Sequence, residues 1–310
     1  MTDAPTDTGM PDDDDEGMLV SESPSGHHLA DDVTSGSREA LRRSSVSAFI
    51  DEARIRVPTR RNSLLEQVIS RVNEDRELKA WWHVANLNAV VRLRMNDHSW
   101  VHMQIVTNIG LKLLRLLHRA GIEPSMVEDY NMSRRDAEVV VVLGCLLHDV
   151  GMSVHRRGHE EYSLFLAERK AQELLEDLYS LGERTVMVSE VLQAIISHRS
   201  DGQPLTVESG VVRVADALDM STGRSRIPFE QGSTSIHALS SAAIERVGIR
   251  RGSERPVRIE IDMNNSTGVF QVDELLRAKL QSSGLEQHFE VEARVHEQER
   301  SLVRKFTLGG

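Results

Sequence analysis

The chain has 310 residues, 39% of them hydrophobic and 4% aromatic, which is enough to bury a large and mainly aliphatic core. No apolar run approaches the roughly 18 to 20 residues that cross a bilayer, and the single cysteine, Cys145, excludes an intrachain disulfide, so we expect a cytoplasmic protein. Residues 1–45 hold eleven acidic and three basic residues and so account for most of the net charge of −11. The rest of the chain is therefore close to neutral and gives no signal for nucleic-acid or membrane binding.

Residues 1–45 are predicted to form a disordered acidic tail. They contain the acidic run 12–16, the serine-rich stretch 21–26 and almost no large apolar side chains. Such a segment cannot bury enough apolar surface to offset the entropy of ordering the chain.

From residue 46 to about residue 230 the sequence is predicted to be helical. Apolar residues recur at spacings of three and four over 64–72 and 105–117, as on the buried face of a helix. A third helix begins after Ser133, which forms a capping-box pattern with Asp136 and is followed by an apolar run. Further helices are predicted over 159–180, 184–198 and 206–219. The core of the fold is therefore expected to be a helical bundle.

The character of the sequence changes near residue 255, and 231–310 is predicted to be a linker and a small α/β subdomain. Residues 257–263 alternate between apolar and polar side chains, as a half-buried strand does. A helix and two further strands, which could pair, are predicted over 272–280, 290–295 and 303–308. If the strand at 257–263 lies at the edge of a sheet, it could pair across a homodimer.

Side chains of the kinds that bind metals lie at the ends of the predicted helices. His148 and Asp149 stand side by side after the apolar run 139–147, where an imidazole and a carboxylate are costly to bury without partners. A divalent metal ion satisfies both groups. The other core-facing candidates are His98, His102, His159, His198 and Asp216. Any one of them could be a buried polar residue with a hydrogen-bond partner or a helix cap. Because helix caps are more often Ser, Thr or Asn, the whole set of histidines and acids favours a metal site.

With these residues, the region 95–220 resembles the core of the HD-domain superfamily of metal-dependent phosphohydrolases, whose pattern is H…HD…D. The pattern is met by His102, His148, Asp149 and Asp216. Val106, four residues after His102, is typical of the family and favours His102 over His98 as the first ligand. The resemblance implies that His98 lies behind the ligands, from where it could still reach the ion or a phosphate.

The resemblance also implies one or two divalent ions as cofactor. Family members with two ions have additional histidines between the HD pair and the last Asp, and His159 and His198 occupy such positions. Asp149 would then bridge the ions, and with His148 it is a candidate catalytic residue. In a one-ion site, Asp97 could act as the base. Imidazole and carboxylate ligands without a thiolate suit Mn, Fe, Co, Ni, Zn or Mg.

Several arginines that follow these ligands are candidates for binding a substrate phosphate, because the guanidinium group suits two-point phosphate recognition. They are Arg156, Arg157, Arg199, Arg224 and Arg226. Each is explained equally well as a residue of a solvated loop or a surface ion pair. The resemblance implies a phosphohydrolase or phosphodiesterase in which a metal-activated hydroxide hydrolyses a phosphoester or phosphoanhydride, and we expect a nucleotide-type small molecule as the substrate. A di-iron oxygenase and a non-catalytic nucleotide-binding sensor remain as alternatives.

Overall fold

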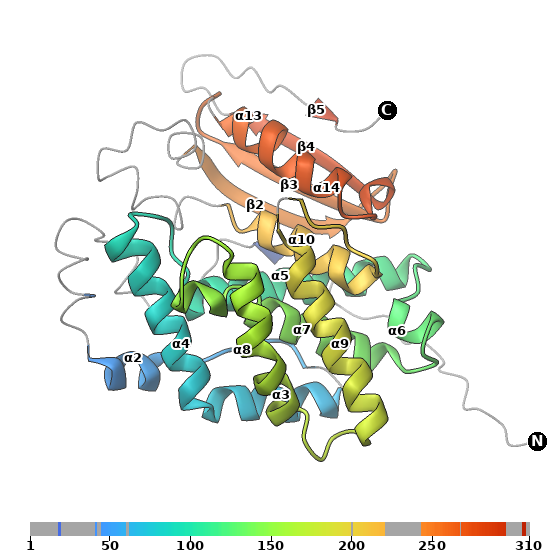
Figure 1. Ribbon diagram of the computed structural model, residues 1–310. Helices are drawn as coiled ribbons and strands as arrows, with labels where there is room; N and C mark the ends of the chain where they lie inside the picture. Colours follow the sequence, from blue (N-terminus) through green and yellow to red (C-terminus); the bar gives the residue numbers. More distant parts are fainter. Residues whose placement is uncertain are drawn as a thin grey trace, which may run out of the picture.

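The computed structural model shows a helical body that carries a smaller sheet-containing part (Figure 1). It describes residues 18–19, 41, 45–59, 62–199, 201–220, 243–266, 268–295 and 306–307. Most of the acidic tail predicted at 1–45 lies outside the described residues, as do Arg224, Arg226 and most of the strand predicted at 303–308. None of the helices in the described part of the chain combines the length and the apolar character that a membrane crossing requires.

The helical body lies between residues 46 and 218. In chain order its helices are α2 (Val46–Glu52), α3 (Ser63–Glu74), α4 (Arg76–Asn86), the π-helix η1 (Leu87–Arg92), α5 (Trp100–Arg119), α6 (Ser125–Glu128), α7 (Arg134–Leu147), the 3₁₀ helix η2 (Val150–Ser153), α8 (His159–Leu174), α9 (Leu181–Ser197) and α10 (Val207–Leu218). The prediction of a mainly helical fold is confirmed.

Helix α7 is the central element of this body. From Ala137 to Leu147 every side chain except that of Glu138 is buried, and the helix packs against α3, α5, α9 and α10. A helix that is apolar on all sides is expected in such a position. The apolar run ahead of His148 and Asp149 is therefore a core helix, and it carries the pair into the interior.

Helix boundaries follow the signals in the sequence at two places. The chain leaves α5 through Gly121, whose φ of 86° is a left-handed conformation that glycine adopts without strain. Helix α7 begins after Ser133, and the capping box between Ser133 and Asp136 is present as predicted.

The boundary between α8 and α9 differs from the prediction. Helix α8 ends at Leu174 rather than near residue 180. Asp177 adopts a left-handed φ of 61°, and Ser180 already caps α9 through a capping box with Glu183. The chain must therefore turn between these points, and α9 begins at Leu181.

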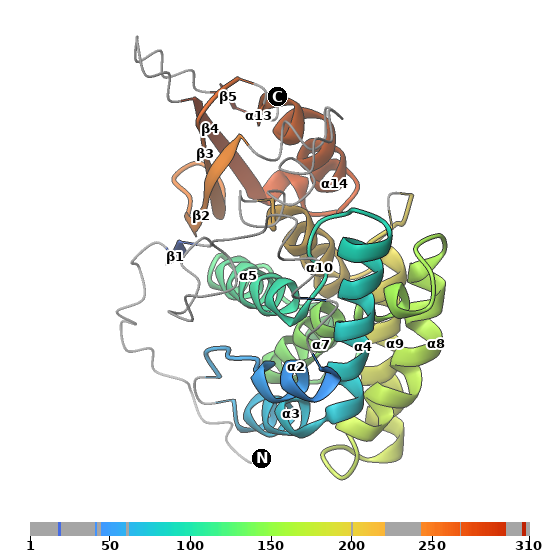
Figure 2. The ribbon, with the colours of Figure 1, turned by 90° about the vertical axis from the view of Figure 1, so that its left-hand side faces the viewer.

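The C-terminal part is a small α/β subdomain. Its sheet has the order β1 (Met18–Leu19), β2 (Ile244–Arg251), β3 (Val257–Met263), β4 (Phe289–Val295), β5 (Phe306–Thr307). Strands β3 and β4 are parallel, and α13 (Gly268–Phe270), the π-helix η3 (Gln271–Leu276), α14 (Arg277–Gln281) and the 3₁₀ helix η4 (Glu286–His288) lie between them in sequence. The other described pairs are antiparallel. The subdomain contacts α5 through β2 and β3, and α10 through η3 and α14 (Figure 2).

The prediction of an α/β C-terminal part is confirmed, with two corrections. Strand β2 was not predicted, because Gly248 and its arginines weaken the alternation that identifies a strand. The suggestion that 257–263 is an edge strand is wrong, since β3 pairs with β2 on one side and β4 on the other. That strand therefore offers no free edge for a homodimer. The predicted pairing of the last two strands is confirmed at residues 306–307.

Candidate metal centre

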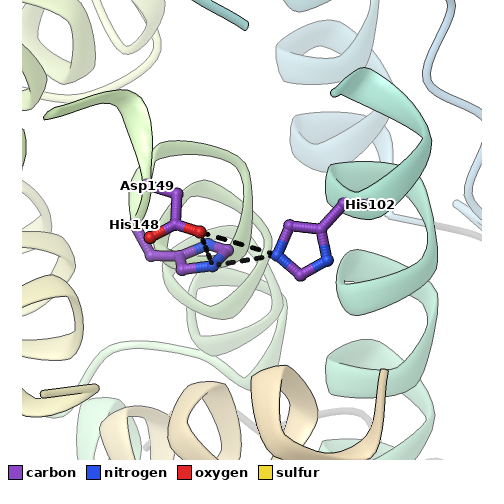
Figure 3. A group of neighbouring side chains, drawn as sticks. All are labelled: His102, His148 and Asp149. Atoms are coloured by element: carbon purple, nitrogen blue, oxygen red, sulfur yellow. Dashed lines mark hydrogen bonds and ion pairs between the residues drawn. The ribbon is translucent and has the colours of Figure 1, made fainter. Parts of the chain in front are cut away.

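The predicted ligands come from separate helices and meet at one place. His102 lies in the first turn of α5, His148 and Asp149 follow α7, His159 begins α8, His198 follows α9, and Asp216 lies in the last turn of α10. Figure 3 shows the side chains of His102, His148 and Asp149 pointing toward one another from two elements. Side-chain contacts shorter than 4 Å connect all six residues to one another, directly or through a neighbour.

The turn after α7 is fixed to the start of α8. A Cβ at Gly151 would lie 2.0 Å from the backbone oxygen of His159, so only glycine allows this approach. The hydroxyl of Ser163 donates to the backbone oxygen of His148 at 2.6 Å and accepts from Gly151 N at 2.9 Å. These bonds hold His159 beside Asp149.

Each histidine of the centre is oriented by an oxygen at its Nδ1. The acceptors are Asn96 O for His98, Asp219 Oδ2 for His102, Cys145 O for His148, Arg156 O for His159 and Ile195 O for His198, at 2.5 to 3.0 Å. Since carbonyl and carboxylate oxygens only accept, Nδ1 carries a proton in His98, His102, His148 and His198, and their Nε2 atoms are the ones left to bind a metal ion. Nδ1 of His159 also faces the guanidinium of Arg156. Metal-binding histidines are typically held in this way.

The centre divides into two halves around Asp149. In the first half, the Nε2 atoms of His102 and His148 are 3.3 Å apart and lie 3.7 and 3.3 Å from Asp149 Oδ2. Asp216 Oδ1 lies 3.8 and 3.7 Å from the same two nitrogens. In the second half, Asp149 Oδ1 lies 3.0 Å from His159 Nε2 and 3.6 Å from His198 Nε2.

These donor sets fit divalent metal ions. Donors about 2.0 to 2.1 Å from a common ion lie on the order of 3 to 3.5 Å from one another, close to the separations in both halves. His102, His148 and Asp149 form one group of mutually close donors, and Asp149, His159 and His198 form another. Asp149 thus offers one carboxylate oxygen to each half.

The electrostatics of the centre also favour a cation. Burial alone would lower the pKa of His148, but the carboxylates of Asp149 and Asp216 raise it to about 10. Burial alone would raise the pKa of Asp149, yet the surrounding imidazoles, above all the positive charge of His148, hold it well below its usual range. The pKa of His198 is lowered, mainly by burial. Without a metal ion, the first half therefore retains a proton to balance its carboxylates.

His98 lies beside the first half, and Asp97 binds Ser99, the residue that caps the helix that follows. His98 is buried, with its Nε2 3.6 Å from Asp149 Oδ2. Asp97 Oδ2 accepts from the backbone nitrogen and the hydroxyl of Ser99, at 3.2 and 2.8 Å, at the start of α5. The role of His98 behind the ligands and the role of Asp97 as a base stay predictions.

The predicted phosphate-binding arginines are placed unequally. Arg156 Nη1 lies 2.8 Å from His159 Nδ1, at the second half. Arg157 is exposed. The guanidinium of Arg199 forms surface ion pairs with Glu161 and Asp201, and its role in phosphate binding stays a prediction.

Two residues near the centre were missed from the sequence. Asp219 Oδ2 lies 2.5 Å from His102 Nδ1, and Lys279 Nζ lies 3.8 Å from Asp216 Oδ2. The spacing of three between Asp216 and Asp219, at the end of an apolar helix, could have indicated the first. No local signal marks the second.

The HD domain matches residues 97–221. The uncharacterised protein MJ1020 of Methanocaldococcus jannaschii is 39% identical over 78% of this chain and 93% of its own length. Ribonuclease Y of Opitutus terrae is 26% identical over 58% of this chain, and the match covers 32% of that enzyme. No solved structure matches the chain.

Proposed function

Since the chain belongs to the HD-domain family of metal-dependent phosphohydrolases, we propose that it hydrolyses a phosphoester or phosphoanhydride bond of a nucleotide-type small molecule. The observation that supports this proposal is the convergence of buried imidazole and carboxylate donors around Asp149. The similarity to a protein named as a ribonuclease favours phosphate bonds of nucleotides as the substrate class.

The ions are proposed to be held by the two halves of the centre. His102, His148, Asp149 and Asp216 would hold one divalent ion, and Asp149, His159 and His198 a second. Such ions lower the pKa of a water molecule and offset negative charge on the phosphoryl group. Mn, Fe, Co, Ni, Zn and Mg all accept nitrogen and oxygen donors of this kind.

The protein's own side chains prepare the centre for this chemistry. Asp149 fixes the distance between the halves, because one carboxylate faces both. Asp219 holds His102 in the tautomer whose Nε2 lone pair can bind a metal ion. The ligand histidines are almost fully buried, so water is excluded around them and charge interactions are strengthened. Among the predicted arginines that the structure describes, Arg156 lies next to His159 and is the best placed to contact a substrate phosphate.

A hydrolysis panel tests the proposal. The full chain would be assayed with bis(4-nitrophenyl) phosphate, 4-nitrophenyl phosphate and a set of nucleoside mono-, tri- and cyclic phosphates, in Mn²⁺, Co²⁺, Ni²⁺ and Mg²⁺. We expect metal-dependent release of product that is absent in His148→Ala. Iron-dependent oxygen consumption without hydrolysis would instead support the di-iron oxygenase. Nucleotide binding that survives in Asp149→Ala, without any turnover, would support the sensor.

A further inference from the structure

A lysine from the C-terminal subdomain reaches the metal centre of the helical body. Lys279 lies on α14, and its ammonium group donates to the backbone oxygen of His198, the residue that ends α9. The same nitrogen lies 3.8 Å from Asp216 Oδ2. Both views show α14 next to α10, the helix that carries Asp216 (Figures 1 and 2).

The position of α14 is fixed by packing against α10. Arg213, which is almost fully buried, donates to the backbone oxygens of Ser197 and Arg199 and, through Nε and Nη2, to the hydroxyl of Ser282 at 3.0 and 2.6 Å. A Cβ at Gly210 would lie 2.5 Å from the backbone oxygen of Ser283. One buried guanidinium therefore ties the end of α9 to the end of α14, with Lys279 between them.

Lys279 stands where the centre meets solvent. Its side chain is 22% exposed and that of Asp216 is 18% exposed, whereas those of the ligand histidines and Asp149 are at most 6% exposed. A substrate that enters on this side meets these two residues first. An anionic substrate needs a cation there, because Asp149, Asp216 and Asp219 are all carboxylates of the centre.

We propose that Lys279 binds a phosphoryl oxygen of the substrate at the metal centre, so that the C-terminal subdomain completes the active site. This inference rests on the proposed function for the phosphate itself. An ammonium group on a flexible stem is a common point charge for phosphate. The arginines predicted from the sequence do not cover this side among the described residues, since Arg156 lies at His159 and Arg199 is paired with acids.

The same helix provides a matched control. Arg277 is exposed and pairs with Asp273 one turn earlier, so its charge does not face the centre in this arrangement. Arg277→Met removes a cation from α14 without removing the one at the centre. Lys279→Met keeps most of the aliphatic stem, Lys279→Gln is a second neutral variant, and Lys279→Arg retains the charge.

The test measures phosphate binding apart from catalysis. The full chain and the variants would be loaded with Mn²⁺, their metal content measured, and inorganic phosphate titrated in by calorimetry. Hydrolysis of bis(4-nitrophenyl) phosphate would be followed in parallel. We expect Lys279→Met and Lys279→Gln to weaken phosphate binding about 10- to 100-fold, the range for a hydrogen bond to a charged group, with a rise in KM and unchanged metal content. Lys279→Arg should recover part of the binding, and Arg277→Met should match the wild type.

The outcomes separate this inference from the proposed function. Phosphate affinity that is unchanged in both neutral Lys279 variants would overturn the inference, whether or not the protein hydrolyses phosphoesters. If the neutral Lys279 variants lose bound metal as well as phosphate binding, the inference is also overturned, because Lys279 would then act only by supporting Asp216. Phosphate binding that depends on Lys279, without any hydrolysis, would support the inference and contradict the proposed function. A wild-type protein that neither binds phosphate nor hydrolyses the ester would overturn both.

Discussion

The two halves of the metal centre differ in how completely the protein surrounds them. The first half offers His102, His148 and Asp216 around one oxygen of Asp149, and the carboxylate of Asp219 orients His102. Among the described residues, the second half offers His159 and His198 around the other oxygen. Nδ1 of His159 faces the backbone oxygen of Arg156 and the carboxylate of Glu160, and Nδ1 of His198 faces the backbone oxygen of Ile195.

This difference indicates that the two halves bind their metal ions with different affinities. Four protein donors nearly complete the coordination of an ion, whereas three leave positions for water or substrate, as in catalytic metal sites. We therefore expect the first half to hold the tighter ion. The second half, which lies next to Arg156, is expected to hold the more exchangeable one.

The largest effect is expected where the halves meet. Asp149→Ala removes a donor from both, so we expect two fewer ions per chain and a fall in kcat/KM of about 10³-fold or more, since metal ions supply several kcal/mol of transition-state stabilisation. Metal analysis and the hydrolysis assay check this. Glu168→Ala, which removes an exposed acid from α8, is the control and should change neither quantity. Two bound ions in Asp149→Ala would contradict a shared carboxylate.

A matched pair of variants separates the halves. If four donors share a binding free energy on the order of 10 to 16 kcal/mol, losing one costs about 10²- to 10³-fold in affinity. We expect His102→Gln to weaken the tighter ion by this factor. His159→Gln should leave that ion in place and release only the weaker one. Titration of the metal-free variants with Zn²⁺ measures both constants, and the opposite order of loss would reverse the proposed ranking.

A smaller effect is expected from the residue that orients His102. Asp219→Asn keeps the shape of the side chain but removes its charge, and such changes behind a ligand typically cost 10- to 100-fold in metal affinity. The loss should be confined to the first half. It can be measured in a His159→Gln background, where that half binds alone. An equal loss measured in a His102→Gln background would mean that Asp219 acts on the whole centre.

The sequence predicts the fold well where local chemistry decides the structure. The apolar run over α7 and the capping box at Ser133 are local features, and both were correctly interpreted. Strand β2 was missed because its pairing with β3 depends on the sheet and not on its own alternation. The end of α8 was misplaced because the cap of the next helix, at Ser180, competes with helix propagation.

The residues of the candidate site also fall into two groups, those that a local sequence signal marks and those that only the packing of the chain brings to the site. His148 and Asp149 were conspicuous because charged or polar groups in an apolar helix require a partner, and the same argument applied to His198. Lys279 could not be found, because its contact with Asp216 depends on how the subdomain packs against α10. The pairing of Arg199 with Glu161 of α8 could not be found either, because the sequence does not place the two segments side by side. The role of Arg199 in phosphate binding stays a prediction.

The metal affinities of the two halves should also respond differently to pH, which is the smallest effect expected for a change of one pH unit. In the metal-free protein, carboxylates raise the pKa of His148 to about 10, against the effect of burial. Burial lowers the pKa of His198 in the second half. A metal ion must therefore displace a proton from the first half at pH 7, but it finds His198 already neutral. Because protons compete less as pH rises, affinity in the first half should increase by up to about tenfold per pH unit between pH 7 and 9.

The metal affinity of the second half should be nearly independent of pH between pH 7 and 9. Calorimetry on metal-free His159→Gln and His102→Gln, in buffers of different ionisation enthalpy, counts the protons released by each half. We expect about one proton from the first half and close to none from the second. Equal proton release would show that the carboxylates of the first half do not hold a proton on His148, and the electrostatic contrast between the halves would then be lost, although the difference in donor number would remain.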